Sequence, residues 1–446
     1  MTTRRVLVTD SDERSALAAC RALAAAGLEV TAGSSRRVSP AAWSRTVKRH
    51  LRLPDPRSDQ VGFVDALARE LQRHPQDVLL CSTEAAALAV SPRRDRVDGL
   101  CRHGLPRHEV LEHCLDKREF MKAARAVGLE PPPSVVAGTS DEARAAAETF
   151  SFPVIVKPWR SVTGNGATRE HSGSVIIDDR EVLSRTVARF GLPVIVQERD
   201  ATPEIVSVGG VFAGGRLLAT VVSHYLRTWP QRAGSASFSE TVEPPSGLLA
   251  QVEALLSRLG FDGLFEVELI RRRDGRFAAI DFNPRIYGSM TLAEAAGVNL
   301  AAIWCDHLLD GDRDVPPARV GVRYRYDDAE VRNALCYLRK GRMRESLEVM
   351  RPHRAVTHAY FRWNDPGPPV ARVIELFSNR LGRALRRSDD TPGVSVRTMT
   401  GATTSFHYAL AYAVGVPLVL MARVGRVLKR RPAPDESRRL VDRAPQ

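Results

Sequence analysis

The sequence predicts an α/β domain, then an α+β unit, and last a mostly helical C-terminal extension. Over residues 1–113, short apolar strands alternate with helices, which is typical of a parallel sheet covered by helices. Over residues 114–311, helices are interspersed with strand pairs joined by glycine-containing turns. Residues 312–446 hold helical pieces separated by prolines. These three segments are the predicted domains.

The N-terminal segment opens with a strand, a helix and a strand over residues 5–9, 11–26 and 28–31. A helix over residues 61–73 and a strand over residues 77–81 continue the pattern. This opening resembles a Rossmann-like unit, in which helices cover a parallel sheet. The glycine fingerprint GxGxxG is absent from it, so the sequence gives little support to a dinucleotide site.

Composition and charge narrow the classes of function. The net charge of +13 comes with a large excess of arginine, which would suit nucleic acid, a membrane surface or an acidic substrate. No basic stripe with interleaved aromatic residues and no zinc-finger spacing accompanies this charge, so we expect no nucleic-acid partner. The six cysteines are scattered without a CxxC pair, and no secretory signal opens the chain. Both observations predict a cytoplasmic protein.

The stretch from Gly263 to Ser289 carries the densest group of chemically useful side chains. It reads as two short strands joined by an Asp-Gly turn. The second strand places Asp281, Asn283 and Arg285 at alternate positions, and Glu268 on the first strand can lie opposite Asp281. Carboxylate and amide oxygens beside a guanidinium suit a divalent cation next to an anion. The alternative is that these acids are only solvated.

The order of motifs along the chain points to a family. An Asp-Lys pair at Lys117 opens a helix, and PVIVKP with Lys157 follows as an apolar strand. A glycine turn, the strand VIVQE, the segment EVELI and the segment DFNPR come next, in that order. This order resembles the ATP-grasp superfamily, in the branch of carbamoyl-phosphate-synthetase large-chain domains and carboxylate–amine ligases. The resemblance covers roughly residues 1 to 310.

The resemblance implies a nucleotide site and a fold: a Rossmann-like domain followed by an ATP-grasp fold, with the helical extension after it. The implied contacts to the phosphates, the adenine and the ribose are Lys117, Lys157, Gly164, Gly166, Gln197, Glu198, Arg199 and Glu204. The implied ligands of Mg²⁺ (or Mn²⁺) are Glu268, Asp281 and Asn283. An ammonium such as that of Lys157 is costly on an apolar strand unless an anion such as phosphate compensates it.

The implied reaction is ATP-dependent ligation of a small-molecule carboxylate to an amine through an acyl phosphate, with ADP and phosphate as products. Arg285 would meet the transferred phosphoryl group or the acyl substrate, Arg227 would clamp a carboxylate, and Lys157 would hold the reacting phosphate. Two alternatives stay open. One is a carbamoyl-phosphate or carboxylase-type enzyme that activates bicarbonate, and the other is a non-catalytic, nucleotide-binding regulator recruited to a membrane.

The C-terminal segment is apolar and then basic. Residues 408–422 are nearly all apolar, and five Arg or Lys side chains follow between residues 423 and 431. Three interpretations remain: a core or dimer-interface helix, a peripheral membrane anchor through residues 408–431, and a spanning helix. Homodimers are common in the resembled family, so a homodimer is also expected.

Overall fold

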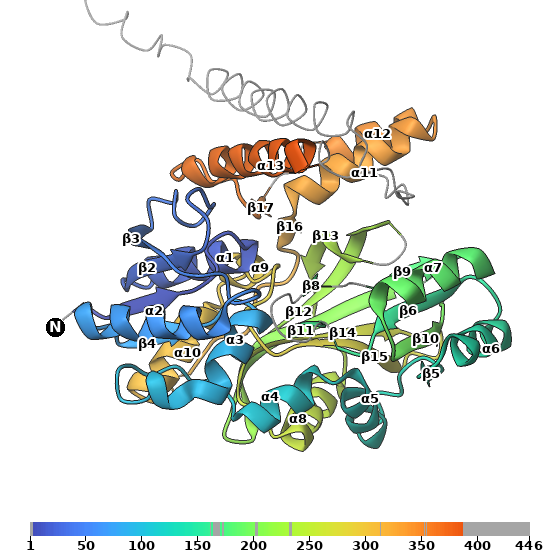
Figure 1. Ribbon diagram of the computed structural model, residues 1–446, viewed down its shortest axis with the longest axis horizontal. Helices are drawn as coiled ribbons and strands as arrows, with labels where there is room; N and C mark the ends of the chain where they lie inside the picture. Colours follow the sequence, from blue (N-terminus) through green and yellow to red (C-terminus); the bar gives the residue numbers. More distant parts are fainter. Residues whose placement is uncertain are drawn as a thin grey trace, which may run out of the picture.

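The computed structural model describes residues 3–386, with internal gaps at 161, 164–169, 172–173, 201–203, 232–233, 313, 352 and 354. Three larger sheets, a two-stranded ribbon and the helices that cover the sheets make up this part of the chain (Figure 1). The mixed α/β class predicted from the sequence is confirmed. Gly164, Gly166 and the C-terminal segment 408–431 lie outside the described residues.

The N-terminal sheet is parallel throughout, with strand order β3-β2-β1-β4. Its elements are β1 (Arg5–Val8), α1 (Arg14–Ala25), β2 (Glu29–Ser34), β3 (Val47–Arg52), α2 (Gln60–Arg73), β4 (Val78–Leu80), α3 (Glu84–Val90) and the 3-10 helix η1 (Ser91–Arg96). Each strand except β3 is buried along most of its length, because helices cover both faces of the sheet. The sequence analysis missed β3, since its residues VKRHLR are mostly charged and show no apolar run.

The second sheet has the order β5-β10-β6-β9, and its neighbouring strands are antiparallel. The chain enters it through α4 (His108–Leu115) and α5 (Lys117–Ala126). Its elements are β5 (Ser134–Ala137), α6 (Ser140–Phe150), β6 (Val154–Pro158), β9 (Val175–Ile177), α7 (Arg180–Phe190) and β10 (Val194–Glu198), with a separate ribbon of β7 (Val162–Thr163) and β8 (Glu170–His171). Both α6 and α7 pack on this sheet and form a small core of their own.

The third sheet has seven strands in the order β15-β14-β11-β12-β13-β16-β17. Its long strands are β11 (Glu204–Ala213), β12 (Arg216–Trp229), β13 (Ser235–Thr241), β14 (Gly263–Arg271) and β15 (Phe277–Asn283), accompanied by α8 (Leu248–Leu259), α9 (Thr291–Ala295) and α10 (Leu300–Leu309). One face of the sheet packs on α5 and α8. On its other side α10 packs against α1, so the N-terminal domain and this sheet share an apolar core.

The sheet continues into the predicted C-terminal extension. The elements after residue 311 are β16 (Arg323–Arg325), α11 (Asp327–Arg339), α12 (Met343–Met350), β17 (Val356–His358) and α13 (Gly367–Arg386). Because β16 pairs with β13 and β17 pairs with β16, the extension completes the large sheet. Figure 1 shows α11, α12 and α13 on the side of the molecule opposite α4, α5 and α8. Strands of three residues carry no readable pattern, so the sequence analysis found only the helices.

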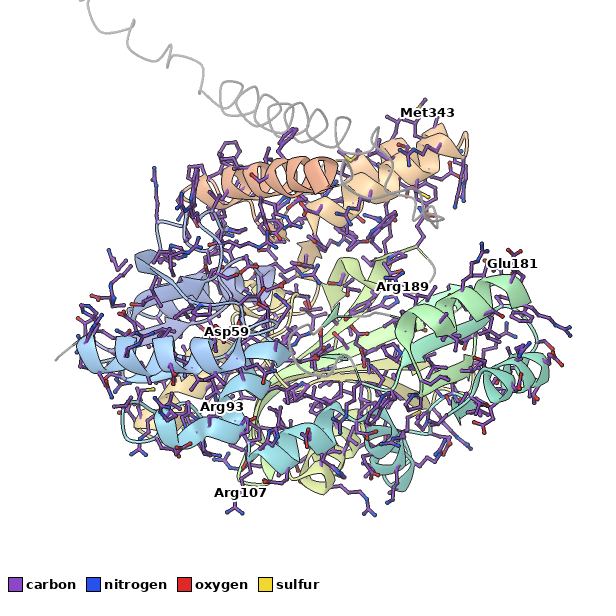
Figure 2. The ribbon with its side chains drawn as sticks, viewed as in Figure 1. Asp59, Arg93, Arg107, Glu181, Arg189 and Met343 are labelled. Atoms are coloured by element: carbon purple, nitrogen blue, oxygen red, sulfur yellow. The ribbon has the colours of Figure 1, made fainter. Side chains whose placement is uncertain are left out.

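Charged side chains are spread over the surface. Figure 2 shows Asp59 before α2, Arg107 before α4, and Glu181 and Arg189 on α7 at the surface of the molecule. Within the described part of the chain, no helix has the length and apolar character needed to span a bilayer.

Candidate functional site

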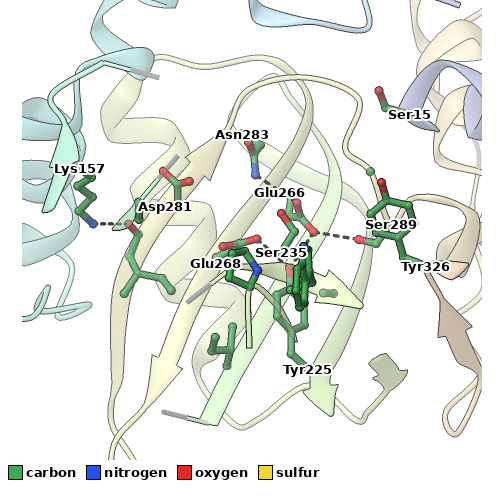
Figure 3. Close-up of a pocket in the computed structure, with 18 of the residues that line it drawn as sticks. Ser15, Lys157, Tyr225, Ser235, Glu266, Glu268, Asp281, Asn283, Ser289 and Tyr326 are labelled. Carbon is green, nitrogen blue, oxygen red and sulfur yellow. Dashed lines mark hydrogen bonds between the residues drawn. The ribbon is translucent and has the colours of Figure 1, made fainter. Parts of the chain in front are cut away.

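A cavity of about 500 Å³ lies where the three sheets meet. Its walls come from the first turn of α1, from β6 and β10 of the second sheet, from the large sheet, and from the C-terminal extension. Figure 3 shows Lys157 and Asp281 at one side of this cavity, Glu266, Glu268 and Tyr225 in the middle, and Ser289, Tyr326 and Ser15 at the other side. The cavity therefore has two distinct ends around an acidic centre.

The acidic centre is built by the register of β14 and β15. Glu268 pairs with Asp281, and Glu266 pairs with Asn283, so the predicted opposition of Glu268 and Asp281 is confirmed. Glu266 was missed, although the Glu-Val-Glu alternation already places it on the same strand face as Glu268. The amide of Asn283 donates to Glu266 Oε2 at 3.2 Å, and Tyr225 donates to Glu268 Oε1 at 2.9 Å.

Two lysines reach this centre from separate elements. Lys117, at the start of α5, forms an ion pair with Asp281. Lys157, on β6, is buried and donates to the backbone oxygen of Ile280 at 3.2 Å. Lys117 is 164 positions from Asp281 in the chain, and Lys157 is 123 positions from Ile280. The packing of α5 and of the second sheet against the third sheet brings them together.

Burial and the neighbouring charges shift the pKa values of these groups. Burial, with the nearby charge of Lys117, lowers the pKa of Lys157 to about 8. Burial, together with Glu266 and Asp281, raises the pKa of Glu268 to about 8. Burial alone would raise the pKa of Asp281, but Lys117 and Lys157 hold it below its usual value. The raised pKa of Glu268 reflects burial and the repulsion of its acidic neighbours, and a bound cation would relieve both.

The donor set fits a hard divalent cation. Glu268, Asp281 and Asn283 offer carboxylate and amide oxygens, the ligands that Mg²⁺ prefers. Among the residues that the structure describes, no three His, Cys, Asp or Glu side chains are preassembled around a single point. The set proposed here contains an amide, and Mg²⁺ commonly uses only one or two carboxylates together with water and substrate phosphates.

The end of the cavity beside β10 suits a flat heterocycle. Gln197 and Glu198 line it, together with the apolar side chains of Ile205, Ile270 and Ile280. Gln197 donates to Ser134 Oγ at 2.8 Å, which fixes its amide. Two of the nucleotide contacts that the resemblance implied, Gln197 and Glu198, thus line this end of the cavity.

Two other predicted nucleotide contacts do not line the cavity. Arg199 follows Glu198 at the end of β10, and Glu204 pairs with Arg271 at 3.5 Å on the outer part of the sheet. The structure gives neither of them a role at the cavity. The glycine turn of Gly164 and Gly166 lies outside the described residues.

Arg285 connects the acidic centre to the N-terminal domain. Its guanidinium donates to Asn283 Oδ1 at 3.1 Å and to Glu84 Oε1, on α3, at 3.3 Å. Glu84 is buried, so this ion pair fixes the guanidinium at the cavity wall. The predicted position of Arg285 beside the metal ligands therefore agrees with the structure.

Arg227 lies elsewhere. Register shifts in the pairing of β12 with β13 fall on both sides of Arg227, whereas Tyr225 and Trp229 line the cavity. The guanidinium of Arg227 forms an ion pair with Glu330 of α11, which has no exposed surface. The expectation that Arg227 clamps a substrate carboxylate therefore finds no support in the geometry, because a bulge re-aims a side chain that plain alternation would turn inward.

The sequence analysis also missed a set of side chains at the other end of the cavity. They come from α1, from the turn after β15 and from the extension: Arg14, Ser15, Ser289, Tyr326, Tyr360 and Arg372. No motif marks them, since they lie on elements that come together only in the folded chain.

Known proteins with this arrangement are ATP-grasp proteins. The family described as "ATP-grasp in the biosynthetic pathway with Ter operon" matches residues 196–329, and the "Carbamoyl-phosphate synthase L chain, ATP binding domain" matches residues 116–199. The first match contains the strands of the acidic centre, and the second contains β6 and most of the second sheet.

The sequence relatives match this chain over only part of their own length. The carbamoyl phosphate synthase large chain of Gemmatimonas aurantiaca is 26% identical over 201 residues, which cover 44% of this chain and 18% of the relative. The formate-dependent phosphoribosylglycinamide formyltransferase of Nitratidesulfovibrio vulgaris is 30% identical over 179 residues, which cover 38% of this chain and 44% of the relative. The matches thus span less than half the length of either relative.

Solved structures share the fold over most of the described chain. The L-amino acid ligase from Bacillus licheniformis aligns with a TM-score of 0.52 at 17% identity, covering 70% of this chain and 76% of the ligase. The N5-carboxyaminoimidazole synthetase from Staphylococcus aureus complexed with ADP aligns with a TM-score of 0.56 at 12% identity, covering 72% and 82%. The fold is therefore the ATP-grasp fold, as the order of motifs predicted.

Proposed function

We propose that this protein is an ATP- and Mg²⁺-dependent ligase that joins a small carboxylic acid to an amine, with ADP and phosphate as products. One observation carries the proposal: Lys117, Lys157 and the acids of β14 and β15 meet in one cavity whose end beside β10 suits an adenine. Relatives named as ligases and synthetases support the same class of reaction.

The chain's own residues account for nucleotide binding. The ammonium groups of Lys117 and Lys157 would hold the β- and γ-phosphates, which replace their present partners Asp281 and Ile280. Mg²⁺ or Mn²⁺ on Glu268, Asp281 and Asn283 would neutralise charge on the same phosphates. Arg285, already fixed by Glu84, would stabilise the negative charge of the transferred phosphoryl group.

The reaction we propose has two steps. A carboxylate oxygen of the acid attacks the γ-phosphorus, the bond to the β-phosphate oxygen breaks, and ADP leaves. The amine nitrogen then adds to the acyl carbon of the acyl phosphate, phosphate leaves, and the nitrogen gives up a proton. The mostly enclosed walls around Lys157 and Glu268 would keep water from the acyl phosphate.

A trapping assay tests this route. The full chain is incubated with ATP, Mg²⁺, hydroxylamine and pools of carboxylic acids, and the products are measured. A hydroxamate formed together with ADP is the expected result, because hydroxylamine intercepts an acyl phosphate. AMP in place of ADP would contradict the proposal.

The same assay separates the two alternatives. Formation of ADP with bicarbonate alone would favour an enzyme that activates bicarbonate. Tight ATP binding without turnover in any pool would favour a nucleotide-binding regulator.

A further inference from the structure

The end of the cavity away from the lysines contains an arginine whose charge is not neutralised by a direct contact. Arg14 is the first residue of α1 and lines the cavity. Its guanidinium forms a hydrogen bond or ion pair with none of the residues that the structure describes, and its close contact is the ring face of Tyr326, 4.1 Å from its Cζ to the ring centroid. By contrast, Arg372 in the same cavity is paired with Asp328 and Glu375.

The position of Arg14 is unfavourable for the helix. The N-terminus of a helix carries partial positive charge and exposed N–H groups, so acidic residues are preferred there and a cation is not. The first turn of α1 holds no acid, and Glu13 before it makes no side-chain capping bond. A cation added to a positive helix end makes a strong local site for an anion, and such broken local rules are expected where a site is functional.

The chain makes room for this guanidinium. A Cβ on Gly288 would lie 2.1 Å from Arg14 Nε and 2.5 Å from its Nη2, so any larger residue at Gly288 would displace the side chain. The carbonyl of Gly288 accepts from the hydroxyl of Tyr324 at 3.2 Å, which fixes this backbone. Arg14 is thus held in a slot between Gly288 and the ring of Tyr326.

Hydroxyl groups surround the same point. Tyr360 is 2% exposed and lines the cavity, and its hydroxyl forms no hydrogen bond with any described residue. The same is true of the hydroxyls of Tyr326 and of buried Ser15, and the rings of Tyr326 and Tyr360 lie 6.2 Å apart. All three residues line the cavity, so their hydroxyls remain available to form hydrogen bonds with a group bound there.

The charges around the slot favour a group with a single negative charge. Asp12 already accepts from Ser34 at 2.7 Å, and Glu13 pairs with Arg57 at 3.2 Å, so neither neutralises Arg14. Their negative charges, and that of Glu266 in the acidic centre, would repel a doubly charged phosphate more than a carboxylate.

We propose that Arg14, with the hydroxyls of Ser15, Tyr326 and Tyr360, binds a carboxylate at the end of the substrate that does not react. This inference rests on the proposed function, in which the reacting group lies at Glu268 and Asp281. The substrate class is therefore a small molecule with a free carboxylate in addition to the group that is ligated. Arg14 would give a planar, two-pronged contact to that carboxylate.

A first experiment needs no turnover. The full chain, saturated with ADP, is treated with phenylglyoxal, and the modification of each arginine is followed by peptide mass spectrometry in chloride, acetate or inorganic phosphate at equal ionic strength. Acetate should slow the modification of Arg14 severalfold and leave exposed Arg273 unchanged. Equal rates in chloride and acetate, or stronger protection by phosphate than by acetate, would overturn the proposal.

A second experiment uses the best acid found in the hydroxamate assay and its analogue with an amide in place of the distal carboxylate. Arg14→Gln should raise the KM for the acid about 10–100-fold, as expected for loss of a charge-assisted pair, and should abolish the preference over the amide. The kcat and the affinity for ADP should stay within a few-fold of wild type, and Tyr360→Phe should raise KM less than Arg14→Gln does.

The two proposals fail differently. If the wild type makes no ADP with any acid, the proposed function fails, and the phenylglyoxal experiment still decides whether Arg14 binds a carboxylate. If the wild type turns over but Arg14→Gln retains both the KM and the preference for the acid, only the carboxylate subsite is wrong.

Discussion

Single ionisable groups in this protein are controlled by how deeply they are buried and by which charge lies beside them. Asp281 stays ionised because two lysines face it, whereas Glu268, one strand away, is held partly protonated by burial and by neighbouring acids. Two carboxyl groups thus behave differently within one cluster.

Asp281→Asn separates binding from turnover. The amide keeps the shape and one oxygen but removes the negative charge that a cation needs. We expect ADP or ATP to bind with an affinity close to wild type, while turnover falls about 10²–10⁴-fold, a typical loss for a disrupted catalytic electrostatic group. The measurements are a nucleotide titration and the ADP-forming assay, and unchanged turnover would remove Asp281 from the metal ligands.

Asp274→Asn is the matched control for that variant. Asp274 lies on the exposed turn of the same hairpin and accepts from the backbone N–H of Arg276 at 3.0 Å. An asparagine can accept the same bond, so both nucleotide affinity and turnover should match wild type. A similar loss in both variants would point to a general disturbance of the hairpin.

The buried carboxyl group of Asp10, which lies outside the acidic centre, should make the stability of the protein depend on pH. Burial raises its pKa to about 7, although Thr9 Oγ1 donates to its carboxylate. The folded state therefore binds a proton more tightly than the unfolded state does. Its contribution to the free energy of unfolding is present below about pH 4 and is lost as pH rises to about 7.

Asp10→Asn should remove this loss. Asn tolerates the left-handed backbone at this position, where φ is 53°. Urea unfolding at pH 4 and at pH 8 should show the variant gaining on wild type at pH 8, by up to about 3–4 kcal/mol relative to their difference at pH 4. A constant difference between the two proteins at all pH values would show that Asp10 is ionised in the folded state.

Strand irregularities decide which side chains of an element reach the cavity. On β12 the shifted pairing around Arg227 turns its side chain toward α11, where it forms an ion pair with Glu330. The Cζ of Arg227 also lies 4.4 Å from the ring centroid of Phe238. The strand therefore contributes Tyr225 to the acidic centre and uses Arg227 to hold α11.

This assignment predicts a structural effect for Arg227→Ala. Removal of one member leaves buried Glu330 without its cation, which typically costs about 3–5 kcal/mol of the free energy of unfolding. Adding Glu330→Gln to that variant should recover part of the loss, because the uncompensated charge is removed. Chemical denaturation measures both. An Arg227→Ala protein of normal stability with a raised KM for the acid would instead restore the carboxylate-clamp hypothesis.

At the scale of the whole molecule, the C-terminal extension is part of the ATP-grasp body. The extension supplies β16 to the large sheet, Tyr326 and Tyr360 to the cavity, and Asp365 to the fully buried Arg21 of α1 at 2.9 Å. The N-terminal domain, the large sheet and the extension are thus joined through a buried ion pair as well as through apolar packing.

Two truncations test this dependence. A chain that ends at residue 311 would expose the edge of β13 and leave Arg21 buried without Asp365, so we expect aggregation or loss of the cooperative unfolding transition. A chain that ends before Thr398 keeps all of these contacts and should unfold at the temperature of the full chain. Equal folding of both would show that the extension is a separate unit.

The longer truncation also tests where the protein resides. Cytoplasmic location and membrane attachment through residues 408–431 are both predictions from the sequence. Cell fractionation of the full chain and of the chain ending before Thr398 compares them: a membrane pool lost on truncation supports attachment, and equal soluble pools contradict it.

The sequence by itself determined the class of fold and the acidic centre, since both rest on local patterns. Alternation placed Glu268 and Asp281 on neighbouring strands joined by a short turn, and the motif order gave the ATP-grasp fold. Lys117 and Lys157 reached the same point as the motif order implied.

Only the tertiary structure decided what lies at the other end of the cavity. Arg14 lies more than 300 positions before Tyr326 and Tyr360 in the chain, and no periodicity relates it to them. Arg227 could not be placed from the sequence either, because a bulge reverses the direction that alternation predicts. The spacing of residues along a strand or helix determines which side chains share one of its faces. Which other elements that face contacts depends on packing between distant parts of the chain.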